Sequence, residues 1–174
     1  SVSIIRFFSD RKERIETNQK NQDAYETYLL KKRKELYSLY QREMEAYSYN
    51  FPSLQQLNDL VHNFNSRIYE RLATDQDFLV FSLGKHFSNV SYQISLPEAG
   101  ISAQGNQMYE QAAEINQEFS MIWSDVSVDL KRSHLGLVGS KGIIHQQLQA
   151  YLCQIATFHS YRDLQIVVLY DEKY

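Results

Sequence analysis

The first third of the chain contains one long run without glycine or proline, which extends from Asp10 to Tyr49. Glu, Lys, Arg and Gln dominate this run, and these residues favour helix. Its apolar side chains recur three or four residues apart, or at a multiple of that spacing: Tyr25, Leu29, Leu36, Tyr40 and Tyr47. One position of this stripe, Lys32, is charged. The run therefore predicts a single helix of about 35 residues, near 50 Å long, that forms a stalk or a coiled-coil arm.

Two basic clusters on this helix each allow two interpretations. The Lys31–Lys34 run is the solvated face of the helix, or it attracts anionic lipid headgroups. Nearer the N-terminus, the apolar residues Ile4–Phe8 precede Arg11, Lys12 and Arg14. This order is typical of the cytoplasmic end of a membrane helix, since basic residues are enriched there. A frayed apolar terminus explains it equally well.

Charge and cysteine content argue against several classes of protein. The formal net charge is -3 at pH 7, whereas nucleic-acid-binding domains usually carry a basic excess on one face. We therefore expect no nucleic-acid partner. The single cysteine, Cys153, cannot form an internal disulfide, and its place in an apolar helical pattern predicts a buried, inert thiol.

A proline separates the long helix from a second helix. Pro52 disfavours helical geometry in the residue before it, so the first helix ends near residue 50. Ser53 and Gln56 predict a capping box for the second helix, which continues to about Arg71. We expect its apolar stripe to pack against a core, and this stripe consists of Leu54, Leu57, Val61, Phe64 and Ile68.

Two segments that follow predict a β-hairpin. Phe78–Leu83 is mostly apolar, and Val90–Leu96 alternates apolar with polar residues. Gly84–Asn89 would join the two strands. A loop over 97–106 then leads into a helix with one apolar side, formed by Met108, Ala112, Ile115 and Phe119.

The last third of the chain has the pattern strand, glycine turn, helix, strand. The alternation of Val126, Val128 and Leu130 predicts one strand, and 134–139 predicts a short second strand. A helix is expected from about Ile143 to His159, with three side chains pointing inward: Leu148, Leu152 and Ile155.

After a turn at 160–163, the segment Leu164–Tyr170 is continuously apolar, which is typical of a strand buried in a parallel sheet. The right-handed crossover rule makes this unit half of an α/β nucleotide-binding fold. The sequence therefore predicts an α/β fold with a parallel sheet over residues 51–174, preceded by the helix at 1–50.

The glycine turn before the last helix reads GLVGSKG and resembles a phosphate-binding loop. A working loop reads G-x-x-x-x-G-K-[ST]: its amides hold the phosphates, its lysine contacts the β and γ oxygens, and its hydroxyl holds Mg²⁺. If Lys141 takes the lysine position, Leu135 and Ser140 stand where the two glycines belong. Gly142 then stands in place of the hydroxyl residue, so three of the four defining positions fail.

A second alignment of the same turn fails as well. It keeps Gly136 as the first glycine and Gly139 inside the loop, and it places Lys141 at the second glycine. Gly142 then replaces the lysine and Ile143 replaces the magnesium ligand, so the phosphates lose their counter-ion and the metal loses its hydroxyl. We therefore expect neither ATP nor magnesium to bind, although weak anion binding at the helix N-terminus stays open.

No other group of residues predicts a catalytic or metal site. Asp171 and Glu172 follow an apolar strand as magnesium-binding acidic residues do, but only a short turn separates that strand from the loop helix. An acidic strand end that faces solvent is the favoured interpretation. Five histidines show no metal-ligand spacing, and they are His62, His86, His134, His145 and His159. No nucleophile-elbow pattern accompanies them.

Several stretches resemble known motor proteins. VDLKRSHLGLVGSKG resembles the approach to the ATP-binding loop in FtsK/SpoIIIE ATPases, where DL and then H-apolar-apolar-G precede the glycine turn. QLQAYLCQIATFHSYRDLQIVVLYD is similar to their next helix, turn and strand, although Tyr161 stands where proline is usual. The order of RIYER, DQDFLVFSLG, the hairpin and the charged helix is similar to the membrane-bound ATPase of type VII secretion, the EssC/EccC type. The resemblance covers essentially the whole chain.

This resemblance implies a place within a larger protein. In that family a segment of this layout follows the second transmembrane helix and precedes tandem ATPase domains. It implies a degenerate RecA/FtsK-like P-loop NTPase-type core over 51–174, with the stalk at 1–50 continuing from a membrane-spanning region upstream. The family's catalytic residues do not carry over, because the matching positions are Lys141, Gly142 and Ile143.

The function implied by the resemblance is that of a non-catalytic pseudo-ATPase domain at the cytoplasmic face of the bacterial cell membrane. Such a domain would couple a membrane pore to downstream ATPase domains and regulate the export of small helical proteins. The implied partners are those ATPase domains, other membrane components of type VII secretion, and further copies in a hexamer.

Two alternatives stay open. The first is an active or weakly nucleotide-binding NTPase, in which Lys141 contacts phosphate and Asp171 or Glu172 holds the metal. The second is a fragment of a DNA translocase, which the acidic balance and the absence of a basic stripe interleaved with aromatic residues make less favoured.

Overall fold

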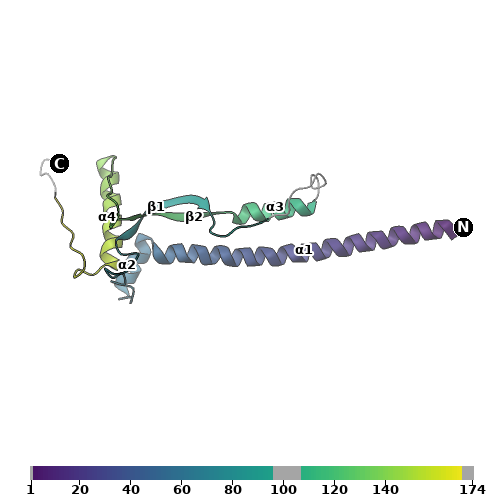
Figure 1. The fold of residues 1–174 in the computed structure, drawn as a ribbon, viewed down its shortest axis with the longest axis horizontal. Helices are drawn as coiled ribbons and strands as arrows, with labels where there is room; N and C mark the ends of the chain where they lie inside the picture. The colour runs from purple at the N-terminus through teal and green to yellow at the C-terminus, as the bar shows by residue number, and fades with distance from the viewer. Residues whose placement is uncertain (1, 96–106, 170–174) are drawn as a thin grey trace. The chain divides into compact units, whose positions relative to one another are not determined.

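The computed structural model describes residues 2–95 and 107–169, with side chains for 16–95, 107 and 109–169. Its elements follow in the order α1 (Val2–Asn50), α2 (Leu54–His62), β1 (Val80–Asn89), α3 (Gln107–Phe119), β2 (Met121–Asp129) and α4 (Lys141–Phe158) (Figure 1). β1 and β2 form a two-stranded antiparallel sheet. The mixed α/β class is therefore confirmed, and so is the single long N-terminal helix.

The chain divides into two compact units. The first, unit 1, comprises Ser1–Glu43 and Ser88–Ile122, and the second, unit 2, comprises Met44–Phe87 and Trp123–Tyr174. Both units take residues from either side of position 50. The expected division into 1–50 and 51–174 stays a prediction.

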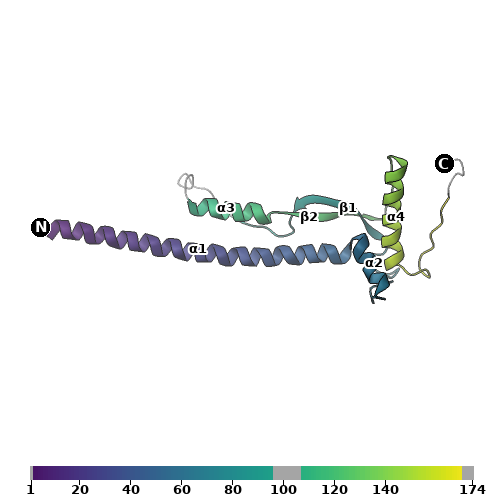
Figure 2. The same cartoon turned by 180° about the vertical axis from the view of Figure 1, so that it is seen from behind.

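In unit 1, α3 runs alongside α1, as Figures 1 and 2 both show. Leu29 of α1 and Phe119 of α3 are buried, and the ring of Tyr40 lies edge-on to Phe119 with centroids 5.9 Å apart. An exposed ion pair of 2.9 Å joins Arg33 to Glu118. The apolar faces predicted for these two helices are thus confirmed at Leu29, Tyr40 and Phe119.

The basic run Lys31–Lys34 is partly neutralised within unit 1. The Nζ of Lys32 lies 2.7 Å from a carboxylate oxygen of Glu35, and Arg33 pairs with Glu118. These pairs reduce the attraction that the run can exert on anionic headgroups, since two of its four basic groups, Lys32 and Arg33, already have a carboxylate neighbour.

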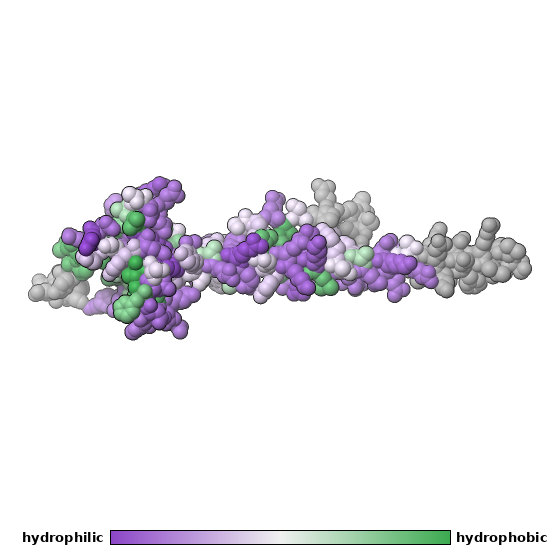
Figure 3. Space-filling view, turned by 90° about the horizontal axis from the view of Figure 1, so that it is seen from below, coloured by the Kyte–Doolittle hydropathy of each residue, from purple (hydrophilic) through white to green (hydrophobic). Residues whose placement is uncertain are grey.

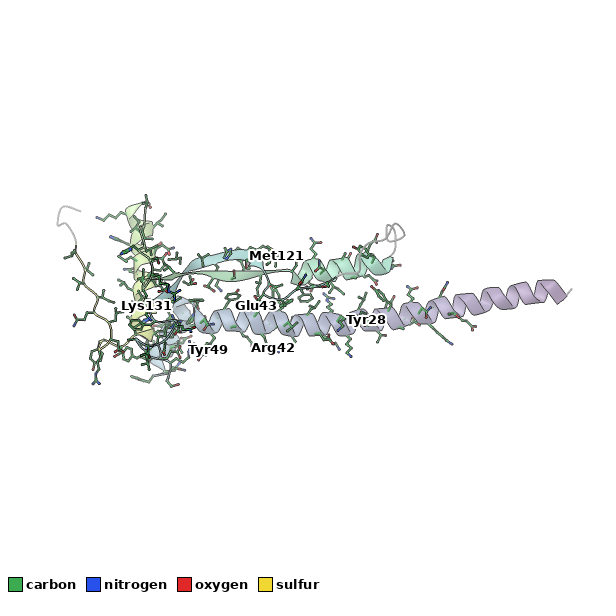
Figure 4. All side chains as sticks on the ribbon, in the orientation of Figure 1. Tyr28, Arg42, Glu43, Tyr49, Met121 and Lys131 are labelled. Atoms are coloured by element: carbon green, nitrogen blue, oxygen red, sulfur yellow. The ribbon has the colours of Figure 1, made fainter. Side chains whose placement is uncertain are left out.

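The segment after β1 is held by side chains of unit 1. Figure 4 shows Glu43 and Arg42 on opposite sides of α1. The two carboxylate oxygens of Glu43 accept hydrogen bonds from the Ser91 N–H at 3.0 and 3.1 Å, and one also accepts from the Ser91 hydroxyl at 3.0 Å. The hydroxyl of Tyr92 donates to the carbonyl of Phe119 at 3.2 Å.

The predicted hairpin is therefore wrong. β1 covers Val80–Asn89, which includes the expected loop, and 90–95 forms no strand. The alternation of burial survives, because Tyr92 and Ile94 are half-buried while their neighbours are exposed. β1 continues through the expected loop because Gly84 adopts a φ of +146°, a conformation that essentially only glycine reaches.

In unit 2 the expected capping box starts α2. The Ser53 hydroxyl accepts from the Gln56 N–H at 3.3 Å, and the Gln56 side chain accepts from the Ser53 N–H at 2.8 Å. The helix ends at His62, well before Arg71, because Phe64 turns into the left-handed region with a φ of 48°.

The stripe that was expected to pack α2 against a core is mostly uncovered. Leu57 is 3% exposed, whereas Leu54, Val61 and Phe64 are 53%, 49% and 90% exposed. The prediction of a buried stripe is wrong for these three residues, because α4, the neighbouring helix, leaves their side chains uncovered.

The core of unit 2 joins β1 to α4. Phe81, Tyr151 and Ile155 are buried together, and half-buried leucines and one valine surround them: Leu83, Val128, Leu130, Leu135, Leu137 and Leu164. Ile155 points inward as expected, but Leu148 is 43% exposed and Tyr151 takes the inward place instead.

Two further expectations about unit 2 are wrong. Cys153 is exposed rather than buried. Within 2–95 and 107–169, the expected parallel sheet does not form, and 134–139 and 164–169 lie outside any strand. A strand needs a neighbour for its backbone groups, and these segments have none here; Val167 and Leu169 are 79% and 92% exposed.

Some expectations fall outside the described residues: Leu96, the loop at 97–106, the side chain of Met108, Tyr170 and the pair Asp171 and Glu172. The side chains of Ile4–Phe8 fall there too. Among the residues that are described, no helix combines the length and the apolar character that a membrane span requires.

Candidate functional site

The glycine turn is anchored on one side and open on the other. Leu135 and Leu137 are half-buried against the core of unit 2, whereas Val138 between them and α4 is fully exposed. Lys131, at the start of the approach, donates to the backbone carbonyl of Asp75 at 2.9 Å, and its Nζ lies 5.2 Å from the ring of Phe78. The segment before the turn is thus fixed against unit 2, and the turn itself is exposed to solvent.

The backbone conformation of the turn does not require glycine at any of its three glycine positions. Gly136, Gly139 and Gly142 do not have a positive φ, and a Cβ at Gly136 or Gly142 would meet nothing within 4 Å. At Gly139 the nearest atom would be Cγ1 of Ile144, at 3.9 Å, which is an ordinary contact. The missing side chains therefore leave the turn's backbone open, which is what a bound anion would need.

The residues at the start of α4 offer little else to a nucleotide. Ser140 is the N-cap residue in extended geometry, but its side chain caps no N–H group. Ile143, at the magnesium position of the second alignment, is 60% exposed and apolar. Among the described residues, no three His, Cys, Asp or Glu side chains are grouped closely enough to hold a metal ion.

The structure thus places the six predicted residues together on one exposed turn, at Gly136, Gly139, Ser140, Lys141, Gly142 and Ile143. They lie close together in space simply because they are neighbours in the sequence. The helix N-terminus supplies amides and a favourable dipole, and the positions that would need a lysine and a hydroxyl hold Gly142 and Ile143.

A buried arginine beside Phe158, at the C-terminal end of α4, was not predicted. The guanidinium of Arg71 donates to the carbonyls of Asn50, at 2.6 Å, and Val80. Its Nε lies 3.2 Å from a carboxylate oxygen of Asp77, and its Cζ lies 4.6 Å from the ring centre of Phe158. Desolvation lowers the pKa of Arg71, and the charge of Asp77 acts in the opposite direction.

His159 is a second buried polar residue, just after α4. Its Nε2 accepts from the Leu79 N–H at 2.9 Å, and its Nδ1 lies 2.8 Å from the carbonyl of Ile155. Because Nε2 is an acceptor, we assign the proton to Nδ1. Desolvation lowers the pKa of His159 from 6.5, so the ring is neutral in the folded protein near pH 7.

Gln154 completes a row of side chains along β1. Its amide accepts from the N–H of Ser82 at 2.9 Å and donates to the carbonyl of Ser82 at 3.1 Å, as a neighbouring strand would. Arg71 donates a hydrogen bond to the Val80 carbonyl of the same strand. This edge of β1 is therefore blocked, which explains why the sheet does not grow there. The sequence signal for this role was weak, since Gln154 is one of four glutamines on α4 and nothing in the sequence distinguishes it from a surface residue.

Comparisons with known proteins support the expected lineage. No protein-family model and no solved structure matches the chain. Three curated relatives do match: the ESX secretion system protein YukB of Bacillus subtilis (strain 168), 28% identical over 99% of this chain; the ESX secretion system protein EccC of Geobacillus thermodenitrificans (strain NG80-2), 29% identical over 98%; and the type VII secretion system protein EssC of Staphylococcus aureus (strain NCTC 8325 / PS 47), 26% identical over 94%. These EssC/EccC-type secretion-system proteins are homologues of the chain over nearly its whole length.

The chain spans 12% of the length of the YukB and EccC relatives and 11% of the EssC relative. The family assignment was thus predictable from short motifs and their order. In the second alignment, Gly142 and Ile143 remain the residues that distinguish the glycine turn from a working phosphate loop.

Proposed function

We propose that this chain is a non-catalytic, pseudo-ATPase segment of a type VII secretion protein. The observation that carries the proposal is the glycine turn, which keeps the outline of a phosphate loop but has Gly142 and Ile143 at the lysine and magnesium positions. Secretion-system relatives match nearly the whole chain, and this supports its assignment to a type VII secretion protein.

In this proposal the segment couples a membrane pore to downstream ATPase domains and regulates protein export. Its core would descend from a RecA/FtsK-like P-loop domain, with α4 as the former loop helix. Its partners would be the ATPase domains of a longer chain, other membrane components of type VII secretion at the cytoplasmic face, and further copies in a hexamer. The relatives are far longer than this chain, so these partners and this location are inferred from the similarity to the relatives and not from the chain's own residues.

Calorimetry with MgATP tests the absence of nucleotide binding. We expect no binding heat and no phosphate release from the chain, and no change in a Gly139→Ala variant. Micromolar affinity that disappears on Gly139→Ala would overturn the proposal. Hydrolysis that disappears on Lys141→Ala would instead support an active NTPase.

A restored loop tests the lineage separately. The combined substitutions Lys141→Gly, Gly142→Lys and Ile143→Thr turn residues 136–143 into a full G-x-x-x-x-G-K-T pattern, and all three sites are exposed. We expect this variant to gain measurable affinity for MgATP, because the lysine and hydroxyl return to the helix N-terminus. If it gains none, the turn does not descend from a phosphate loop.

In the full-length protein, the proposal predicts that Lys141→Ala leaves export of a secreted substrate unchanged, because Lys141 performs no phosphate chemistry. Loss of export with normal protein abundance in that variant would contradict a non-catalytic role.

A further inference from the structure

An open groove of about 1280 Å³ lies within unit 2, between α2 and α4. One wall carries large apolar side chains, among them Leu54, Val61 and Phe64, and the other wall carries small residues of α4: Ala150, Cys153 and Ala156. None of the residues that line the groove is charged. Figure 3 shows hydrophobic residues exposed over this part of the surface.

Phe64 occupies a position where its side chain is disfavoured. The turn after α2 has the hydrogen bonds of a Schellman motif, from the Phe64 N–H to the Val61 carbonyl at 3.2 Å and from the Asn65 N–H to the Leu60 carbonyl at 3.0 Å. Phe64 is the left-handed residue of this motif, with a φ of 48°, and glycine is usual there. A bulky residue in this conformation is a sign of function, since the backbone would be less strained with glycine.

The ring of Phe64 is also 90% exposed. Phe64 thus has an unfavourable backbone conformation, and its exposed side chain contributes little to packing within unit 2. Leu54 and Val61 on α2 are exposed as well, so three large apolar side chains in and just after α2 are uncovered, which is the arrangement expected of a binding surface.

We propose that this groove binds an α-helix of a partner protein, through an apolar and uncharged face of that helix. The helix lies along α4 and places its large side chains against Phe64, Val61 and Leu54.

The lack of charge defines the chemistry of the partner. A charged side chain on the docked face would be buried against residues that cannot pair with it, and this costs far more than it gains. The neutral amides of Gln146 and Gln149 lie along the same groove and suit polar but uncharged residues beside the anchors.

The groove favours a helix over an extended segment. Its walls are side chains of helices, so a strand placed there would leave its own N–H and C=O groups without partners. A helix satisfies those groups internally. The small residues on α4 let a helix backbone approach closely, and the lined part of α4, from Gln146 to Thr157, spans about 16 Å. This length matches anchors at positions i, i+4 and i+7 or i+8 of the partner.

Cys153 provides a direct test, because it is the chain's single cysteine and lies exposed in the groove. The probe is a 14-residue amphipathic peptide with leucine at positions i, i+4 and i+7 and only alanine and glutamine beside them. The matched control peptide has glutamate at the middle anchor. The measurement is the rate at which a maleimide modifies Cys153.

We expect the leucine peptide to slow this modification in a saturable manner and the glutamate peptide to leave it unchanged. Phe64→Gly should weaken the protection by about 30-fold, as expected for the loss of a buried aromatic anchor. The same variant should melt at the wild-type temperature or above, because glycine suits the left-handed position. The loss of binding would therefore not come from unfolding.

Two further variants complete the test. Ala156→Glu places a charge in the wall at an exposed helical site and should abolish protection, whereas Leu148→Gln lies outside the groove and should leave it intact. Three outcomes overturn the proposal: no protection by the leucine peptide, equal protection by both peptides, or protection that rises with protein concentration alone, which would identify a second copy as the occupant.

Discussion

At the scale of single residues, unit 2 depends on polar side chains placed where apolar ones would be ordinary. Arg71 and His159 are 4% and 3% exposed; Arg71 donates to the carbonyl of Val80 at the start of β1, and His159 accepts from the N–H of Leu79 just before it. A buried donor or acceptor that loses its partner costs about 1 to 3 kcal/mol. These two residues therefore make the fold of unit 2 sensitive to single substitutions and to protonation.

We predict that unit 2 loses stability as the pH falls from 8 toward 5.5. Desolvation lowers the pKa of folded His159 below 6.5, so the unfolded chain binds more protons in this window. The stabilisation is complete above the unfolded pKa and is lost as the pH falls through the lower pKa of the folded state. Protonated Nε2 could not accept from Leu79, and the added charge would face Arg71, with Asp77 the nearest compensating carboxylate.

The urea midpoint, measured across this pH range, checks the prediction. His159→Gln should be less stable at pH 8 and should show a flatter dependence on pH. His145→Gln, at an exposed position of α4, should keep the wild-type dependence. A wild-type midpoint that stays constant between pH 8 and 5.5 would show that His159 does not titrate during unfolding.

At the scale of elements, the helices were predictable and most strands were not. α1 and α4 follow from local propensity, spacing and a proline, all of which act within a few residues. Strands depend on distant neighbours, and this explains why the apolar run at 164–169 forms none. The side chains that block β1, such as Gln154, belong to a helix far away in sequence, so no local pattern announces them.

The packing of α3 on α1 gives a prediction at this scale. Phe119→Ala should destabilise unit 1 by about 3 to 5 kcal/mol, because Phe119 is 4% exposed and contacts Tyr40. The neighbouring Glu118→Ala removes only an exposed ion pair with Arg33 and should cost no more than about 1 kcal/mol. Hydrogen exchange of α3 amides measures both, and similar protection in the two variants would contradict this packing.

At the scale of the whole molecule, the two candidate sites differ in how far the sequence revealed them. The defects of the glycine turn are residue identities, so Gly142 and Ile143 could be read directly from the sequence. The groove could not be read, because its apolar stripe has the pattern of a core-facing helix. Only the structure shows that Leu54, Val61 and Phe64 remain uncovered.

Another uncovered apolar stretch lies within 164–169, and it predicts how the chain behaves on its own. Ile166, Val167, Val168 and Leu169 are 49%, 79%, 65% and 92% exposed, carry no charge and are not paired in a sheet. Such a run offers free backbone groups to other copies, so we expect concentration-dependent association through strand pairing.

Val167→Lys should delay this association, because a lysine in the run repels a second copy and its exposed site adds little strain. Val138→Lys is the matched control, since Val138 is fully exposed but lies between glycines in a segment anchored by Leu135 and Leu137. Light scattering and thioflavin fluorescence at several concentrations measure the difference. If both variants associate as fast as the wild type, residues 164–169 do not drive self-association, and another exposed apolar surface, such as the α2–α4 groove, must do so.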